Sequence, residues 1–173
     1  GDTFPNAHTL SLVAATASEG NRRPGVVYGD TDIVDSEGRF LRHRHHSAPD
    51  TLSWKSFLGG MLVCHQAFYA LTSIARDVPY IISYRYSADV DWCIRVMKEA
   101  QRRQLPLANT HQVVAHFLDG GMTTVHHRAS LKERFRVMAH HYGTMPTLLQ
   151  HCRFALSAII RKCQTSKHND KQK

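Results

Sequence analysis

The segment YSADVDWCIRVMKEA, residues 86–100, has the pattern of an amphipathic α-helix with two aspartates at its start. Its apolar residues recur three or four positions apart and therefore fall on one helix face, while charged residues fall elsewhere. The apolar positions are Val90, Ile94, Met97 and Ala100. The segment predicts a helix that packs one face on a core and carries acidic side chains in its first turn.

Asp89 is the first candidate for chemistry. Ser87 can cap the helix, which places Asp89 in the first turn, where unpaired backbone N–H groups and the helix dipole favour a carboxylate. A carboxylate held ionised on a rigid helix end can act as a general base. The alternative is that Asp89 is only a first-turn acid, a common feature of helices. This segment alone leaves both interpretations open.

The composition predicts one packed domain with a basic surface. The chain has 173 residues, 42% of them apolar, and a formal net charge of +8 with its 13 histidines counted as neutral. Such a surface favours anionic partners, and nucleic acid, an anionic membrane and a nucleotide diphosphate all qualify. The cysteines form no CxxC pair, and neither a membrane-spanning run nor a signal peptide is visible. We expect reduced, core or near-core thiols and a cytoplasmic protein.

The chain opens with Gly1-Asp2-Thr3-Phe4-Pro5 and has no initial methionine. Gly-Asp followed by a proline is typical of a loop after a strand, and no strand precedes it. We therefore expect a sequence that is truncated at its N-terminus.

Local patterns predict the other elements. Helices are expected at 5–17, at 67–75 and from Ser130 to about His141, the last opened by a capping box of Ser130 and Glu133. Short strands or extended segments are expected at 26–28, 33–34, 39–41, 80–84 and 111–117, with Gly29 and Asp30 breaking the first run.

A last helix carries an apolar stripe, and basic residues lie on its other side. The stripe consists of Leu148, Leu149, Cys152, Ala155, Leu156, Ile159 and Ile160. Such a helix can pack on the domain or lie on an anionic membrane surface.

Three polar motifs interrupt the apolar pattern. His65-Gln66 lies within an apolar segment, so the pair is either bonded to backbone or faces a cleft. The glycine loop at 119–124 either approaches a ligand or is only a turn. The basic run at 42–46 reads as a solvated loop, since no second pair of zinc ligands lies at a recognisable spacing.

Four segments in this order resemble bacterial family-2 glycosyltransferases with the GT-A fold, most closely the colanic-acid, exopolysaccharide or O-antigen type. They are YGDTDIVD at 28–35 with Gly38, CHQ at 64–66, ADVDW at 88–92 with Arg95, and residues 117–124 with a glycine pair. Each segment is short, but the resemblance as a whole covers the chain from residue 1 to about residue 145. The first four residues are similar to the end of the Asn-Ser-Gly-Asp segment that replaces the DxD metal motif in this group.

The resemblance implies an α/β fold, the C-terminal part of a GT-A domain with a mixed sheet in an α/β/α sandwich. Residues 1–145 would be the acceptor-side, catalytic part. Beyond the resemblance, the residue pattern predicts a basic amphipathic helix and a disordered lysine-rich tail at residues 146–173. The nucleotide-binding half would lie upstream of Gly1.

The resemblance also assigns roles to the aspartates. Asp89 matches the expected catalytic base, although the residue before it is alanine where many members have glutamate. Asp91 matches a second acid that supports the site or orients the acceptor. Asp2 matches the last acid of the segment that would hold Mg²⁺ or Mn²⁺. Asp30 and Asp32 spell DxD but follow that segment in the family order.

Further site residues follow from the same resemblance. His65 and Gln66 would line the sugar site. The loop over the diphosphate or acceptor would contain Gly120, Gly121, Thr123 and Thr124. Many relatives carry a metal-binding histidine in this loop, and this sequence does not.

The implied enzyme is a hexosyltransferase of cell-surface polysaccharide synthesis. It would move a sugar from a nucleotide-diphosphate sugar to a saccharide or lipid-linked saccharide, with inversion and with Asp89 as general base. The metal would neutralise the leaving diphosphate. The protein would act in the cytoplasm, where peripheral contact with the anionic inner membrane is an option, and no nucleic-acid partner is expected.

Two other classes stay open. A nucleic-acid-binding module fits the charge, but it would interleave exposed aromatics with basic residues, whereas the aromatics here mostly fall in apolar runs. A fragment without catalytic activity would follow from loss of the nucleotide-binding half.

Overall fold

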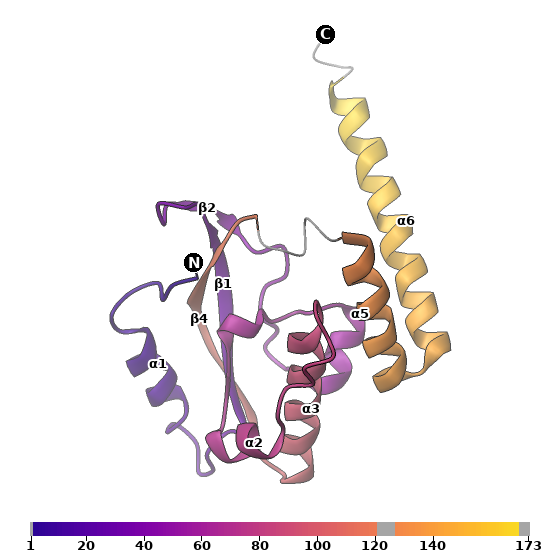
Figure 1. Cartoon of the computed structure of the whole chain (residues 1–173). Coiled ribbons are helices and arrows are strands. Elements are labelled where there is room, and N and C mark those ends of the chain that lie inside the picture. Colours follow the sequence, from indigo (N-terminus) through magenta and orange to yellow (C-terminus); the bar gives the residue numbers. More distant parts are fainter. Residues whose placement is uncertain (1, 121–126, 170–173) are drawn as a thin grey trace.

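The computed structural model describes residues 2–120 and 127–169 and contains a four-stranded mixed sheet (Figure 1). Strand β1 (Val26–Val34) pairs in parallel with β4 (Leu107–Leu118) along its length. Strand β2 (Phe40–His43) pairs antiparallel with the end of β1, and β3 (Phe68–Ala70) pairs antiparallel with its beginning. Because β4 occupies one edge of β1, strands β2 and β3 share the opposite edge.

Helices lie on both sides of this sheet (Figure 1). Helix α1 (Thr9–Thr16) lies on one side and α3 (Ala88–Arg102) on the other. The short helices η1 (Trp54–Gly59), η2 (His65–Ala67) and α2 (Thr72–Asp77) belong to the segments between β2 and α3. Helix α5 (His127–Tyr142) packs on α3, and α6 (Thr144–Asn169) packs beside α5 and extends past the rest of the domain.

The core lies mainly between β1 and α3, and the predicted helix at 86–100 is confirmed. Its apolar face is buried, since Val90, Ile94, Met97 and Ala100 are each at most 2% exposed. Burial of one large apolar side chain stabilises a fold by about 1.5–3 kcal/mol. The α3–β1 contact therefore fixes the helix whose first turn carries Asp89.

Strand β1 is continuous, so the prediction that Gly29 and Asp30 break it is wrong. Gly29 lies opposite a bulge of β4, because Tyr28 pairs with Asn109 and Asp30 pairs with Val113. A Cβ atom on Gly29 would lie 2.4 Å from Oγ1 of Thr110 and 2.6 Å from the carbonyl oxygen of Gln112. Glycine is needed at this position for the close approach of two backbones, which propensity alone does not reveal.

Other boundaries also differ from expectation. The predicted helix at 67–75 is wrong, because residues 68–70 pair with β1 as strand β3 and the helix begins only at Thr72. Residues 80–84 form a turn instead of a strand, closed by a hydrogen bond from Tyr84 to the carbonyl of Ile81 at 3.2 Å. The helix expected at 5–17 is shorter. At residues 68–70, pairing with the open edge of β1 outweighs the local preference for a helix.

The expected α/β class with a mixed sheet is confirmed. Two of the thiols, Cys64 and Cys93, are buried and unpaired as expected, whereas Cys152 is exposed. None of the helices within residues 2–120 and 127–169 combines the length and the apolar character needed to cross a bilayer.

Candidate functional site

Asp89 lies in the first turn of α3, beside the 3-10 helix η2. Its Oδ1 accepts a hydrogen bond from the N–H of Val90 at 2.9 Å, and its Oδ2 lies 3.2 Å from Nδ1 of His65. The side chains of His65 and Asp89 are 39% and 28% exposed, so a ligand can reach both. The structure thus brings together an aspartate and a histidine that lie 24 positions apart in the sequence.

The surroundings of Asp89 keep its carboxyl group ionised. Burial raises the pKa of Asp89, but the hydrogen bond and charge of His65, the N–H of Val90 and the charge of Arg134 more than offset that effect. The pKa of Asp89 therefore lies below its ordinary value of 3.8. An ionised carboxylate can accept the proton of a bound hydroxyl, so Asp89 has the protonation state of a general base.

Gln66 links this pair to the first residues of the chain. Its Nε2 donates to Oδ2 of Asp2 at 2.7 Å, and its Oε1 accepts from the thiol of Cys64 at 2.6 Å. The other oxygen of Asp2 accepts from the N–H of Leu118 at 3.0 Å. Asp2, Thr3, Phe4, Gln66, Tyr69 and Ala115 line a cavity of about 310 Å³. His65 and Gln66 thus face two neighbouring features, the Asp89 carboxylate and this cavity.

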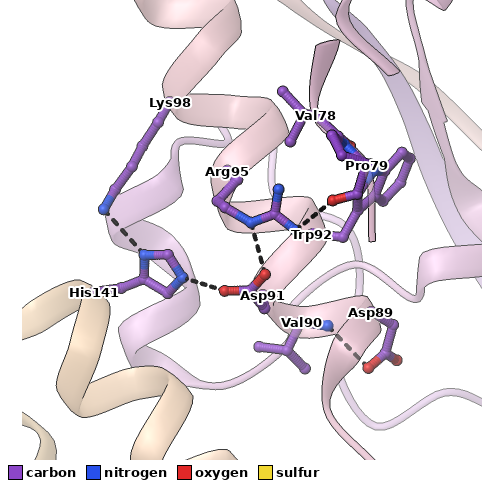
Figure 2. Close-up of polar contacts among 9 residues, drawn as sticks. All are labelled: Val78, Pro79, Asp89, Val90, Asp91, Trp92, Arg95, Lys98 and His141. Atoms are coloured by element: carbon purple, nitrogen blue, oxygen red, sulfur yellow. Dashed lines mark hydrogen bonds and ion pairs between the residues drawn. The ribbon is translucent and has the colours of Figure 1, made fainter. Parts of the chain in front are cut away.

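Asp91 has different surroundings from Asp89, and Figure 2 shows the two carboxylates on opposite sides of α3. Asp91 is 1% exposed; its Oδ2 accepts from Nε of Arg95 at 2.6 Å and its Oδ1 lies 2.8 Å from Nε2 of His141. An acceptor cannot reach a carboxylate buried in this way, so the role of orienting the acceptor does not fit Asp91. A supporting role fits, since Asp91 joins α3 to α5.

The histidine of this buried cluster is neutral. Burial lowers the pKa of His141, and this effect outweighs the hydrogen bond to Asp91, which raises it. Nδ1 of His141 lies 3.1 Å from Nζ of Lys98, which can only donate, so Nδ1 accepts and Nε2–H donates to Asp91 (Figure 2). Lys98, His141 and Asp91 therefore form one chain of hydrogen bonds.

The start of α3 is held by Glu133 of α5. Ser87 is the N-cap residue as predicted, but its hydroxyl makes no capping bond and is buried without a partner. Oε1 of Glu133 accepts from the N–H groups of Tyr86 and Ser87 at 2.6 and 2.7 Å, and Oε2 accepts from Arg85 at 2.9 Å. The predicted capping box is wrong, because α5 begins at His127 and Glu133 reaches another helix.

Replacing Glu133 by glutamine should lower the free energy of unfolding by about 1–3 kcal/mol at neutral pH, since an amide cannot accept all three bonds. Burial raises the pKa of Glu133, but three N–H donors and the charge of Arg136 leave the pKa below its ordinary value of 4.5. This stabilisation is present above pH 4.5 and is lost as the pH falls through the lowered pKa. Urea unfolding at a series of pH values measures it, and a difference that stays constant into acid contradicts it.

Arg44 supports the segment that precedes His65, and sequence reasoning missed it. It belongs to the basic run at 42–46, which was expected to be a solvated loop, and the neighbouring histidines are indeed exposed. Arg44 instead donates to the carbonyl oxygens of Leu62, at 2.9 Å, and Met61. Burial lowers the pKa of Arg44. No sequence signal distinguishes this arginine from its neighbours.

The metal candidates do not converge in the structure. Oδ1 of Asp30 accepts from the N–H of Ala48 at 2.7 Å, and Oδ1 of Asp32 lies 2.8 Å from Nδ1 of His43. Both oxygens of Asp2 are bonded to protein groups. Within the described ranges, no three His, Cys, Asp or Glu side chains are grouped so that they could hold a metal ion. Asp2, Asp30 and Asp32 are therefore not gathered at one metal site within the described residues.

The glycine loop lies largely outside the described residues. Gly120 is described and has a positive φ of 93°, which favours glycine. Gly121, Thr123 and Thr124 fall within residues 121–126, outside the described ranges. Asp119 connects this end of β4 to β1 and β2, since its N–H donates to the carbonyl of Val34 at 3.0 Å and its Oδ1 lies 3.3 Å from Arg42.

Comparisons with known protein families, curated proteins and solved structures find no match to this chain.

Proposed function

We propose that this chain is the acceptor-side part of an inverting glycosyltransferase that transfers a hexose from a nucleotide-diphosphate sugar. The observation that carries the proposal is the Asp89–His65 pair: an ionised, reachable carboxylate held 3.2 Å from a histidine at the start of a buried helix. The ordered motifs of the sequence support it, and with them the proposal extends to bacterial family-2 enzymes of the GT-A fold that build cell-surface polysaccharides.

The proposed reaction is a single displacement. The oxygen of an acceptor hydroxyl attacks the anomeric carbon of the donor and forms the new glycosidic bond. The bond from that carbon to the diphosphate oxygen breaks, and its electron pair leaves with the nucleoside diphosphate. Asp89 takes the hydroxyl proton. General-base catalysis of this kind typically accelerates a reaction by about 10² to 10⁴. His65 holds the Asp89 carboxylate in place, and Gln66 borders the neighbouring cavity.

Isothermal titration with a panel of uridine and guanosine diphosphate sugars tests this proposal. The longest available form of the protein is titrated, because the resemblance assigns the donor contacts largely to the nucleotide-binding half. Heat of binding with one donor is expected. If no donor binds and affinity for RNA or DNA falls steeply with salt, the nucleic-acid-binding alternative is favoured instead.

We also propose that α6 contacts an anionic membrane, where a lipid-linked acceptor would be found. Helix α6 packs on α5 and η1, yet the described side chains of its apolar stripe are exposed. Within the stripe, the exposed fractions are 46% for Leu148, 63% for Leu149 and 59% for Leu156. An apolar stripe on a basic helix is the pattern of helices that lie in the bilayer interface.

Sedimentation with vesicles tests this contact. The protein should bind vesicles that contain phosphatidylglycerol, bind less as salt rises, and not bind vesicles of phosphatidylcholine alone. Leu149→Asp should weaken binding, because it places a charge in the stripe. The matched control is Leu10→Asp, since Leu10 is 55% exposed on α1. Equal binding of the two variants, or equal binding to both kinds of vesicle, contradicts the proposal.

A further inference from the structure

Two aromatic rings form a stack at the outer side of α3. The rings of Tyr80 and Trp92 lie 4.9 Å apart between centroids and 9° from parallel. Trp92 is held by a hydrogen bond from its Nε1–H to the carbonyl oxygen of Val78 at 2.8 Å. Its ring also makes an edge-to-face contact with Phe68, with 5.9 Å between the ring centroids. Tyr80 is 46% exposed, and Trp92 covers one face of its ring, so the other face is the one that a ligand could contact.

The stack lies beside Asp89. Trp92 follows Asp89 by three positions in α3, a spacing that places two side chains on the same side of a helix. Figure 2 shows Asp89 and Trp92 on the side of α3 that faces away from His141. The electrostatics agree: burial is the main cause that raises the pKa of Tyr80 to about 12, and the negative charge of Asp89 also raises it.

An aromatic ring whose open face points to solvent suits a particular kind of ligand. The face of the ring carries partial negative charge and attracts the C–H groups on the apolar face of a pyranose. Trp92 holds the Tyr80 ring in one orientation, so a ligand would not have to order it. A sugar stacked here would have its hydroxyl groups at the rim, on the side of α3 that carries Asp89 and Trp92.

We infer that the open face of Tyr80, backed by Trp92, is a binding platform for the pyranose ring of the acceptor saccharide. This rests on the proposed function and deepens it, because the sugar that stacks beside Asp89 is the one whose hydroxyl loses its proton. The neighbouring Ile82, 97% exposed, belongs to the same loop but is not part of the stack, and it serves as a control.

Trp92 reports on the platform directly. In a Trp54→Phe background, Trp92 is the only tryptophan of this chain, and its emission should change on titration with methyl glucosides, galactosides or mannosides at millimolar concentrations. Tyr80→Ala should raise the dissociation constant about 3- to 10-fold, the effect of losing one aromatic stacking contact. The dissociation constants of Tyr80→Phe and Ile82→Ala should stay within about 2-fold of the parent value, since both variants keep the aromatic ring at position 80. Far-UV circular dichroism checks that each variant is folded.

Three outcomes overturn the inference: no emission change with any hexopyranoside, equal binding by Tyr80→Ala and the parent, or a response to uridine and not to hexopyranosides. The titration contains no donor, so it is independent of catalysis. If hexopyranosides bind through Tyr80 and no nucleotide sugar supports transfer, the platform stands and the proposed function fails. If transfer occurs and Tyr80→Ala leaves the acceptor KM unchanged, the platform fails alone.

Discussion

Replacing Asp89 by asparagine should lower the rate of glycosyl transfer at least about 100-fold while the fold and the binding of nucleotide survive. Asparagine has nearly the same shape and can still accept the hydrogen bond from Val90, but its amide cannot take up a proton at neutral pH. The loss should therefore appear in kcat, with donor affinity unchanged, because the carboxylate acts on the acceptor proton. The measurement is initial-rate kinetics with a nucleotide sugar that binds.

Asp50→Asn is the matched control, since Asp50 is another carboxylate with a side chain 92% exposed and apart from the candidate site. This variant should transfer at the parent rate. The pKa of Asp89 lies below 3.8, so Asp89 stays ionised around neutral pH. If the rate of transfer changes with pH in that range, the change comes from the titration of another group. Near-normal turnover by Asp89→Asn would remove Asp89 from the mechanism.

Replacing Asp91 by alanine should destabilise the protein by about 3–5 kcal/mol, the typical cost of removing one member of a buried ion pair. Arg95 and His141 would lose their common partner, and His141 is only 3% exposed, so water cannot readily replace the carboxylate. This loss is a large part of the total stability of a typical protein, which is about 5–15 kcal/mol. The midpoint of urea unfolding should fall with little change in slope.

The control for this prediction is Asp50→Ala, which should change the free energy of unfolding by less than about 0.5 kcal/mol, as exposed substitutions usually do. Asp91→Asn should lose an amount of stability between those of Asp50→Ala and Asp91→Ala, since its amide can keep one of the two contacts. A loss below about 1 kcal/mol in Asp91→Ala would show that the Arg95–Asp91–His141 cluster does not hold α3 to α5.

The sequence predicts well those features that depend on local periodicity. The buried face of α3 follows from the spacing of Val90, Ile94 and Met97, and the short strands expected at 33–34 and 39–41 fall on β1 and β2. Features that depend on long-range pairing were missed. Gly29 was expected to end a strand because glycine disfavours strands, and only the bulge of β4 explains why it lies inside one.

The candidate site shows the same division. The first-turn position of Asp89 can be read from the sequence, and its contact with His65 cannot, because that contact joins two elements that pack through tertiary structure. Asp89 and Asp91 lie two positions apart, which puts them on different sides of a helix, so their different fates follow from helical geometry once the buried face is known. Glu133 was misassigned because a capping-box pattern does not reveal which backbone the glutamate reaches.

The most direct test of the proposed chemistry is the ¹H NMR spectrum of a reaction containing the protein, a nucleotide-diphosphate sugar and a saccharide. A new anomeric signal of configuration opposite to that of the donor, formed together with nucleoside diphosphate and absent with Asp89→Asn, is the predicted result. A product that keeps the donor configuration, or the same product from Asp89→Asn, would contradict a single displacement assisted by this carboxylate.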